Sequence, residues 1–163
     1  MSIFVRSVVA NKPKTKDSQR IAIFYAVILV VMAVAQLFTF DEFLKLFADF
    51  GFSDDVRFAY ALAAILVTAE VFALPFLLRM AVSPAFRWLS MACGWLVALV
   101  WLVVTVLLAI NVGTTDNVGF IGTVTDIMPG WWAVFMSIAF GILTAWASWG
   151  LWPQKTRTKK LMK

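Results

Sequence analysis

The residue of this chain with the greatest potential for chemistry is Glu70, a carboxylic acid inside a long apolar stretch. The stretch, R-FAYALAAILVTAEVFALPFLL-R from Arg57 to Arg79, is long enough to cross a lipid bilayer as a helix. An ionisable side chain at such a depth is costly, so it usually faces protein or water and often marks a functional site. Three roles are open for Glu70: a neutral hydrogen-bonding anchor, part of a ligand site, or a group that handles protons or cations.

Other reactive side chains are scarce. The chain has one cysteine, Cys93, and no histidine. One cysteine cannot form an internal disulfide or a Cys-x-x-Cys redox pair. The lack of histidine removes imidazole metal ligands and the commonest general base. We therefore predict no catalytic residues, no metal site and no resident cofactor, and we favour a protein that is not an enzyme.

The composition predicts an all-α integral membrane protein. Hydrophobic residues make up 63% of the chain and charged residues 14%, whereas about a quarter of the residues are charged in soluble proteins. The apolar runs are continuous rather than alternating, which favours helices over a β-barrel. The net charge of +5 lies mostly beside the apolar runs and no nucleic-acid motif accompanies it, so we expect a lipid bilayer and no nucleic acid as partner.

Four apolar runs of sufficient length predict a bundle of four transmembrane helices. Small residues at helical spacing along each run would let the helices approach closely. The prediction divides the chain into basic tails at 1–20 and 153–163 and a membrane domain at 21–152, with spans at about 21–40, 57–78, 86–112 and 131–152.

A short helix is predicted between the first two spans, in the segment TFDEFLKLFADFG. Thr39 and Glu42 have the spacing of a capping box. Apolar residues from Phe43 to Phe50 then recur at intervals of three and four, and Gly51 is a natural helix stop. We expect this helix to lie at the membrane interface with its apolar side towards the bilayer.

The distribution of charge predicts the topology. Twelve of the 14 Lys and Arg residues lie in the two tails and the connection between the second and third spans, whereas the other two connections hold seven acids. The positive-inside rule then places both termini in the cytoplasm. Several tryptophans near span ends are typical of interfacial anchors: Trp88, Trp131, Trp132, Trp149 and Trp152.

Counting along the helices suggests which residues surround Glu70. At a rise of about 1.5 Å per residue, Glu70 lies roughly 13 Å and Gln36 roughly 24 Å from the cytoplasmic end of its span, so Gln36 is not expected to be a direct partner. The level of Glu70 instead holds Trp95 and Thr144, with Tyr25 about a turn below. No Lys or Arg shares this depth, so we predict a protonated, hydrogen-bonded Glu70 in an intramembrane polar site with Trp95, Thr144 and Tyr25.

A second candidate site lies in the outer loop at 111–130, which is rich in Gly, Thr and Asn. The loop is long for a small bundle, and long loops often carry function. Its candidate residues are Asp116, Asn117 and Asp126, with Gln36 at the outer end of the first span. Gln36 is open to two interpretations, an interhelical hydrogen bond or a ligand contact.

The order of these features resembles the DoxX/MauE-type family of small four-span bacterial membrane proteins. The resemblance rests on a first span after Arg20, the aromatic segment from Phe43 to Phe47, Glu70 within the second span, and the glycine-containing outer loop. It implies a four-span fold in the bacterial cytoplasmic (inner) membrane. Members of the family are linked to thiol–disulfide chemistry, methylamine dehydrogenase maturation and quinone-coupled sulfur oxidation.

This chain departs from the redox-linked branch of that family, whose last loop carries a Cys-Gly-Cys-Phe-Gly pattern. The comparable stretch here, Asn117 to Gly122, keeps the glycine and phenylalanine but has neither cysteine. Cys93 lies on the third span and does not replace them. Thiol redox activity is therefore not expected.

Three functions follow as hypotheses. The first is a DoxX-like accessory or binding subunit without catalysis, whose partner is a membrane protein or a second copy of the chain. The second is a quinone- or lipid-interacting subunit of a membrane oxidoreductase, with the redox cofactor supplied by a partner. The third is a small transporter or proton-conducting protein that uses Glu70.

Overall fold

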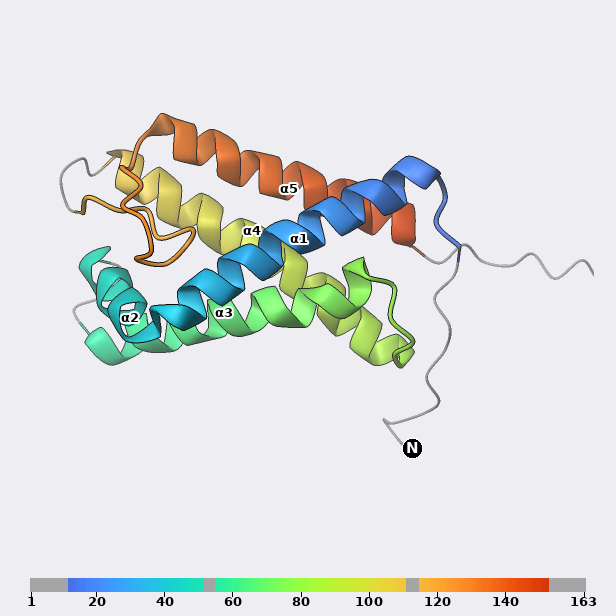
Figure 1. The fold of residues 1–163 in the computed structure, drawn as a ribbon, viewed down its shortest axis with the longest axis horizontal. Helices are drawn as coiled ribbons and strands as arrows, with labels where there is room; N and C mark the ends of the chain where they lie inside the picture. The colour runs from blue at the N-terminus through green and yellow to red at the C-terminus, as the bar shows by residue number, and fades with distance from the viewer. Residues whose placement is uncertain (1–11, 52–54, 111–114, 153–163) are drawn as a thin grey trace, which may run out of the picture.

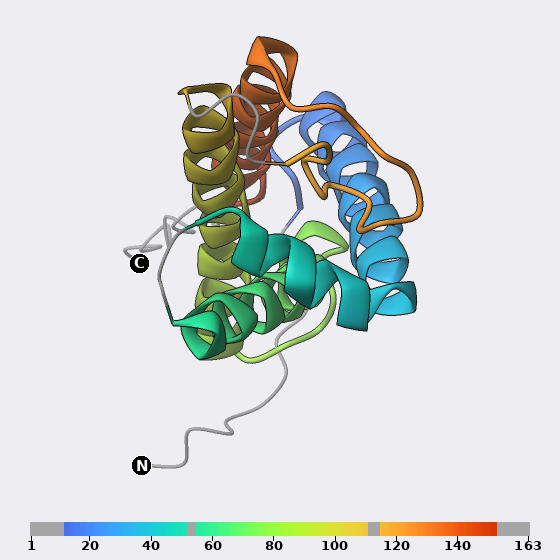
Figure 2. The ribbon, with the colours of Figure 1, turned by 90° about the vertical axis from the view of Figure 1, so that its left-hand side faces the viewer.

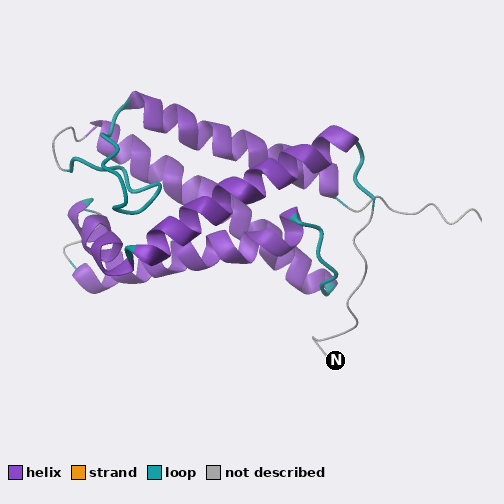
Figure 3. Cartoon of the chain, viewed as in Figure 1, coloured by secondary structure: helices purple, strands orange, loops and turns teal. Residues whose placement is uncertain are grey.

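The computed structural model describes residues 12–51, 55–110 and 115–152. Within these ranges the chain forms helices and no strand (Figure 3). Four of the helices are long and apolar enough to cross a membrane, which agrees with the predicted all-helical class and with four helices of membrane-spanning length. The helices are α1 (Lys16–Phe38), α2 (Phe40–Asp49), α3 (Val56–Leu77), α4 (Pro84–Ile110) and α5 (Trp131–Leu151).

The four long helices form one bundle in which α1 and α4 each pack against both α3 and α5. Figure 1 shows α1 running obliquely across the bundle. The start of α1 and the end of α5 lie at one end, which we call the terminal end. Helix α2 and the loop at 115–130 lie at the opposite end, which we call the loop end, and Figure 2 shows both crossing it.

The outward faces of the long helices are apolar. Phe24 on α1 and Phe135 on α5 are 59% and 68% exposed. The inward faces carry the small residues expected at close helix crossings, including Ala22, Ala63 and Ala147. Apolar surface outside and small residues inside are what a bundle surrounded by lipid requires.

Helix α2 forms at the predicted place, and its aromatic face packs against the bundle. Phe43 and Phe47 are fully buried, and the Phe47 ring lies 6.5 Å from that of Trp101. Gly51 ends the helix with φ +73°, a conformation that glycine adopts without steric cost. The expectation that the apolar side of α2 faces the bilayer is therefore wrong, because that side packs on the bundle. The location of α2 at the membrane interface stays a prediction.

The predicted capping box of α2 does not form, because both of its residues bind the loop. Thr39 Oγ1 donates to Ala35 O (3.2 Å) and accepts from Thr123 N (3.1 Å) instead of capping α2. Glu42 Oε2 accepts from Thr123 Oγ1 (2.7 Å). The contact between α2 and the loop explains why these two residue types occur here.

Pro75 lies inside α3, where it removes one backbone donor from the helix. Ser90 of α4 supports the helix at this point: its Oγ accepts from Phe76 N (2.9 Å) and donates to Ala73 O (3.2 Å). A hydroxyl on a neighbouring helix is a common way to satisfy backbone groups near an intramembrane proline. Helix α3 consequently continues to Leu77.

Candidate functional site

Glu70 is buried among the helices of the bundle, with two hydrogen-bond donors on one carboxyl oxygen. Its Oε1 accepts from Trp101 Nε1 (3.1 Å) and from Gln36 Nε2 (3.3 Å). Gln36 Nε2 also donates to Phe120 O (2.9 Å). Gln36, Glu70 and Trp101 are each 0% exposed. We call Gln36, Glu70, Trp101 and Phe120 the Glu70 cluster. The cluster joins α1, α3, α4 and the loop at 115–130.

The Phe120 carbonyl fixes the orientation of the Gln36 amide. A carbonyl can only accept, so the amide nitrogen of Gln36 must face it. The same nitrogen then reaches Glu70. One side chain therefore connects the backbone of the loop at 115–130 to the buried acid.

The prediction that Gln36 lies too far from Glu70 to be a direct partner is wrong. In that prediction, the heights of Gln36 and Glu70 are counted from Arg20 and Arg79, and these two arginines are taken to lie at the same level. Figure 1 shows that α1 starts farther towards the terminal end than the last turn of α3 reaches, and that the two helices are inclined to each other. The offset brings Gln36 and Glu70 within hydrogen-bond distance.

None of the three residues predicted beside Glu70 is among the donors to its carboxyl group, which are Gln36 and Trp101. Trp95 is 38% exposed and lines a surface groove with Trp149. Thr144 Oγ1 lies near Tyr25 Oη but donates its hydrogen bond to Phe140 O (2.8 Å). Tyr25 is fully buried against Phe140, with ring centroids 6.3 Å apart. The predicted hydrogen bonds from Trp95 and Thr144 to Glu70 are therefore replaced by those from Trp101 and Gln36.

Trp101 is the partner that counting by height missed, although the sequence contained a signal for it. Trp101 follows Gly94 and Ala98 on one face of α4, and all three are buried. Trp95 lies at the edge of that face. Membership of the packed face is therefore a better guide to the partner of Glu70 than height along the helix.

The loop at 115–130 folds inward and inserts Phe120 into the bundle. The Phe120 ring lies 4.7 Å from Trp101 and 5.6 Å from Phe140, centroid to centroid. Gly122 has φ +62°, and a Cβ there would lie 2.5 Å from Thr39 Oγ1. The loop is therefore packed closely against α1 as well as against the core.

Asn117 organises this loop rather than facing a ligand. It is buried, its Oδ1 accepts from Gly119 N (2.9 Å), and its Nδ2 donates to Gly122 O (3.3 Å). Asp116 is exposed, and Asp126 is exposed and accepts from Asn117 Nδ2 (3.4 Å). The candidates of the second predicted site thus separate into a structural asparagine, two surface acids, and Gln36 in the core. Among the described residues, no group of three His, Cys, Asp or Glu side chains could hold a metal ion.

Three buried polar atoms of the core have no hydrogen-bond partner in the described part of the chain: Glu70 Oε2, Gln36 Oε1 and Tyr25 Oη. A carboxyl oxygen and an amide oxygen accept, and a phenol both donates and accepts. The neutral Glu70 predicted from the sequence would carry its proton on Oε2. The cluster can therefore anchor the bundle through Oε1 and still make one further hydrogen bond through Oε2.

No protein-family model, curated protein or solved structure matches the chain. The resemblance to the DoxX/MauE-type family therefore stays a prediction based on the order of sequence features.

Proposed function

We propose that this chain is an integral membrane accessory or binding subunit without catalysis, similar to DoxX-type proteins. In this proposal it crosses the bacterial cytoplasmic membrane four times, with both termini in the cytoplasm and α2 at the outer interface. The observation that carries the proposal is the burial of Glu70. Its carboxyl group is 0% exposed and binds two donors that are themselves 0% exposed, so it supports the bundle rather than facing a substrate.

A groove between α3 and α4 supports a partner role. It has a volume of about 360 Å³ and is open along one side of the bundle. Thr68, its hydroxyl-bearing residue, donates to Ala64 O (2.7 Å), so the groove suits an apolar helix rather than a polar substrate. Small residues are typical of surfaces where membrane helices pack together. The groove is lined by Ala64, Ile65, Thr68, Ala69, Phe72, Leu89, Cys93 and Leu96.

Purification from native membranes tests this proposal. In a mild detergent, we expect the full chain to purify either in a complex with another membrane protein or as a homo-oligomer, in each case with a fixed stoichiometry. Thr68→Phe should fill the groove and reduce the bound partner about tenfold or more, the effect of losing roughly 1.4 kcal/mol. Val71→Phe, on an exposed part of α3 outside the groove, is the matched control and should keep the partner. A monodisperse single chain, folded and without partner, would contradict the proposal.

The unpartnered Glu70 Oε2 favours one alternative, the handling of protons or of a polar ligand such as a quinone. Flux through liposomes, or electron transfer in native membranes, should then require the carboxyl group. Glu70→Gln would abolish either activity if the alternative holds. If Glu70 is a structural anchor, the same variant should leave both activities at the wild-type level, because Gln keeps an acceptor for Trp101.

A further inference from the structure

A second polar feature lies at the terminal end, away from the Glu70 cluster. It is a groove of about 340 Å³ between α4, α5 and the segment before α1. Three indoles form much of its wall, and none of its lining residues is acidic. We call it the tryptophan groove; it is lined by Lys14, Met91, Trp95, Ser148, Trp149 and Trp152.

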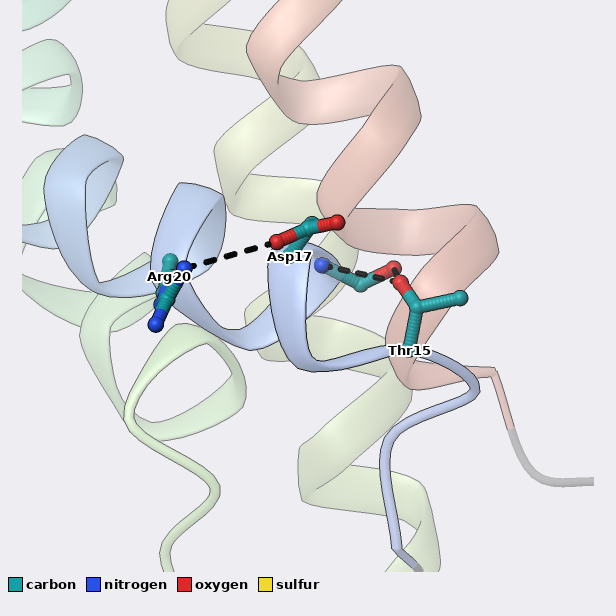
Figure 4. A network of polar contacts seen from close by, with 4 residues as sticks. Thr15, Asp17 and Arg20 are labelled. Atoms are coloured by element: carbon teal, nitrogen blue, oxygen red, sulfur yellow. Dashed lines mark hydrogen bonds and ion pairs between the residues drawn. The ribbon is translucent and has the colours of Figure 1, made fainter.

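Lys14 is held at this groove by both its backbone and its side chain. Its N–H donates to Gly150 O near the end of α5 (3.0 Å), and its Nζ lies 4.6 Å from the centroid of the Trp149 ring. The next residue, Thr15, caps α1 by accepting from Ser18 N (3.0 Å). Figure 4 shows this first turn of α1 beside α5, with Asp17 directed to Arg20. The Lys14 ammonium group is thus held at the groove. Asp17, three residues further on, pairs instead with Arg20, with 3.7 Å between Asp17 Oδ1 and Arg20 Nη1.

Ser148 supplies a second polar group. Its Oγ is buried and has no hydrogen-bond partner in the described part of the chain. An ammonium group and a hydroxyl group are both common donors to phosphate oxygens. Indole rings favour the boundary between lipid headgroups and acyl chains. The chemistry of the tryptophan groove therefore matches a phosphate that carries apolar chains.

We propose that the tryptophan groove binds the headgroup phosphate of an anionic phospholipid. Lys14 Nζ and Ser148 Oγ contact the phosphate, while the acyl chains follow Met91 and Trp95. A choline headgroup fits less well, because the Lys14 ammonium already occupies the face of Trp149 and would repel a second cation. The groove also lies where α1 begins and α5 ends, and the sequence that flanks these two points is basic, which favours anionic lipids around the protein.

The test compares two lysines at the same end. The full chain is purified, delipidated and unfolded thermally in mixed micelles that contain phosphatidylglycerol or phosphatidylcholine, and bound lipid is counted by native mass spectrometry. Phosphatidylglycerol should raise Tm above the value in phosphatidylcholine. Lys14→Gln should weaken phosphatidylglycerol binding about tenfold, the loss typical of one charge-assisted hydrogen bond. Lys16→Gln removes the same charge from an exposed position and should keep the wild-type response.

Ser148→Ala is the second variant and decides the question if Lys14→Gln does not fold. It should weaken phosphatidylglycerol binding several-fold and leave Tm in phosphatidylcholine unchanged. Equal losses in Lys14→Gln and Lys16→Gln would overturn the proposal in favour of general surface charge. If Lys14→Gln lowers Tm equally in phosphatidylglycerol and in phosphatidylcholine, so that the difference in Tm between the two lipids is unchanged, Lys14 is only a structural tether. No preference for phosphatidylglycerol in the wild type would also overturn it.

Discussion

The two ends of the bundle are held together in different ways. At the loop end, large side chains and hydrogen bonds between distant segments fill the space: Phe120 lies against Trp101, and Gln36 joins the loop to Glu70. At the terminal end, α1 and α5 cross so closely that Gly150 lies directly against Ser18. One end holds a packed core of large side chains, whereas the other has a close backbone crossing beside the tryptophan groove.

Because of this difference, we expect the loop end to determine the stability of the bundle and the terminal end to bind lipid. A packed cluster responds strongly to any loss of volume or of a hydrogen bond, because buried groups are left without partners. An open groove can lose a side chain with little effect on folding. We therefore expect substitutions in the Glu70 cluster to change stability in any lipid, and substitutions in the tryptophan groove to change the response to lipid.

The largest effect should come from Trp101→Ala. The side chain is 0% exposed, contacts the rings of Phe47 and Phe120, and donates to Glu70. Its removal should lower the free energy of unfolding by about 3–5 kcal/mol, measured by denaturant titration in detergent. Trp95→Ala, on the same helix but 38% exposed, should cost about 1 kcal/mol or less. Equal losses for the two tryptophans would remove the distinction between core and groove.

Gly122→Ala should be next, because two costs add. A residue with a Cβ is strained at φ +62°, and this Cβ would lie 2.5 Å from Thr39 Oγ1 and 3.1 Å from Ala35 O. We expect a loss of about 3 kcal/mol in the free energy of unfolding. Gly51→Ala is the control: its φ is +73°, but no atom lies within 4 Å of the added Cβ, so only the backbone cost of about 1–2 kcal/mol applies. If both variants lose the same amount, the loop is not packed tightly against α1.

Gly150→Ala tests the close crossing at the terminal end. The added Cβ would overlap Ser18 Cβ and Oγ, and overpacking of this kind should cost about 2–3 kcal/mol. Ser18→Gly removes the overlapping atoms. In the Ser18→Gly background, Gly150→Ala should therefore cost no more than half of what it costs in the wild type. The recovery is read as the coupling between the two sites in a double-mutant cycle. Strict additivity would show that α1 and α5 are farther apart at this point.

The sequence predicted the helices well because their signals are local. Apolar length defines the four spans, and the aromatic spacing after Thr39 defines α2. The sequence also identified Glu70 as the unusual residue. Its partners depend on how far α1 is shifted along α3, which is a property of packing that no local pattern records. The inward fold of the loop likewise depends on Asn117 and Phe120, whose bonds and ring contacts reach distant backbone and other helices.

The smallest effect on stability should come from Glu70→Gln. Gln has the same shape and can accept from Trp101 Nε1 and Gln36 Nε2 through its amide oxygen, while its amide nitrogen takes the place of Oε2. If Glu70 is neutral, as predicted from the sequence, the free energy of unfolding should change by about 1 kcal/mol or less. Glu70→Leu removes the acceptor and leaves the buried indole N–H without a partner, so it should cost about 1–3 kcal/mol more. A large loss already in Glu70→Gln would mean that the cluster holds a charged carboxylate, and the loop end would then be an ionic site rather than a neutral polar core.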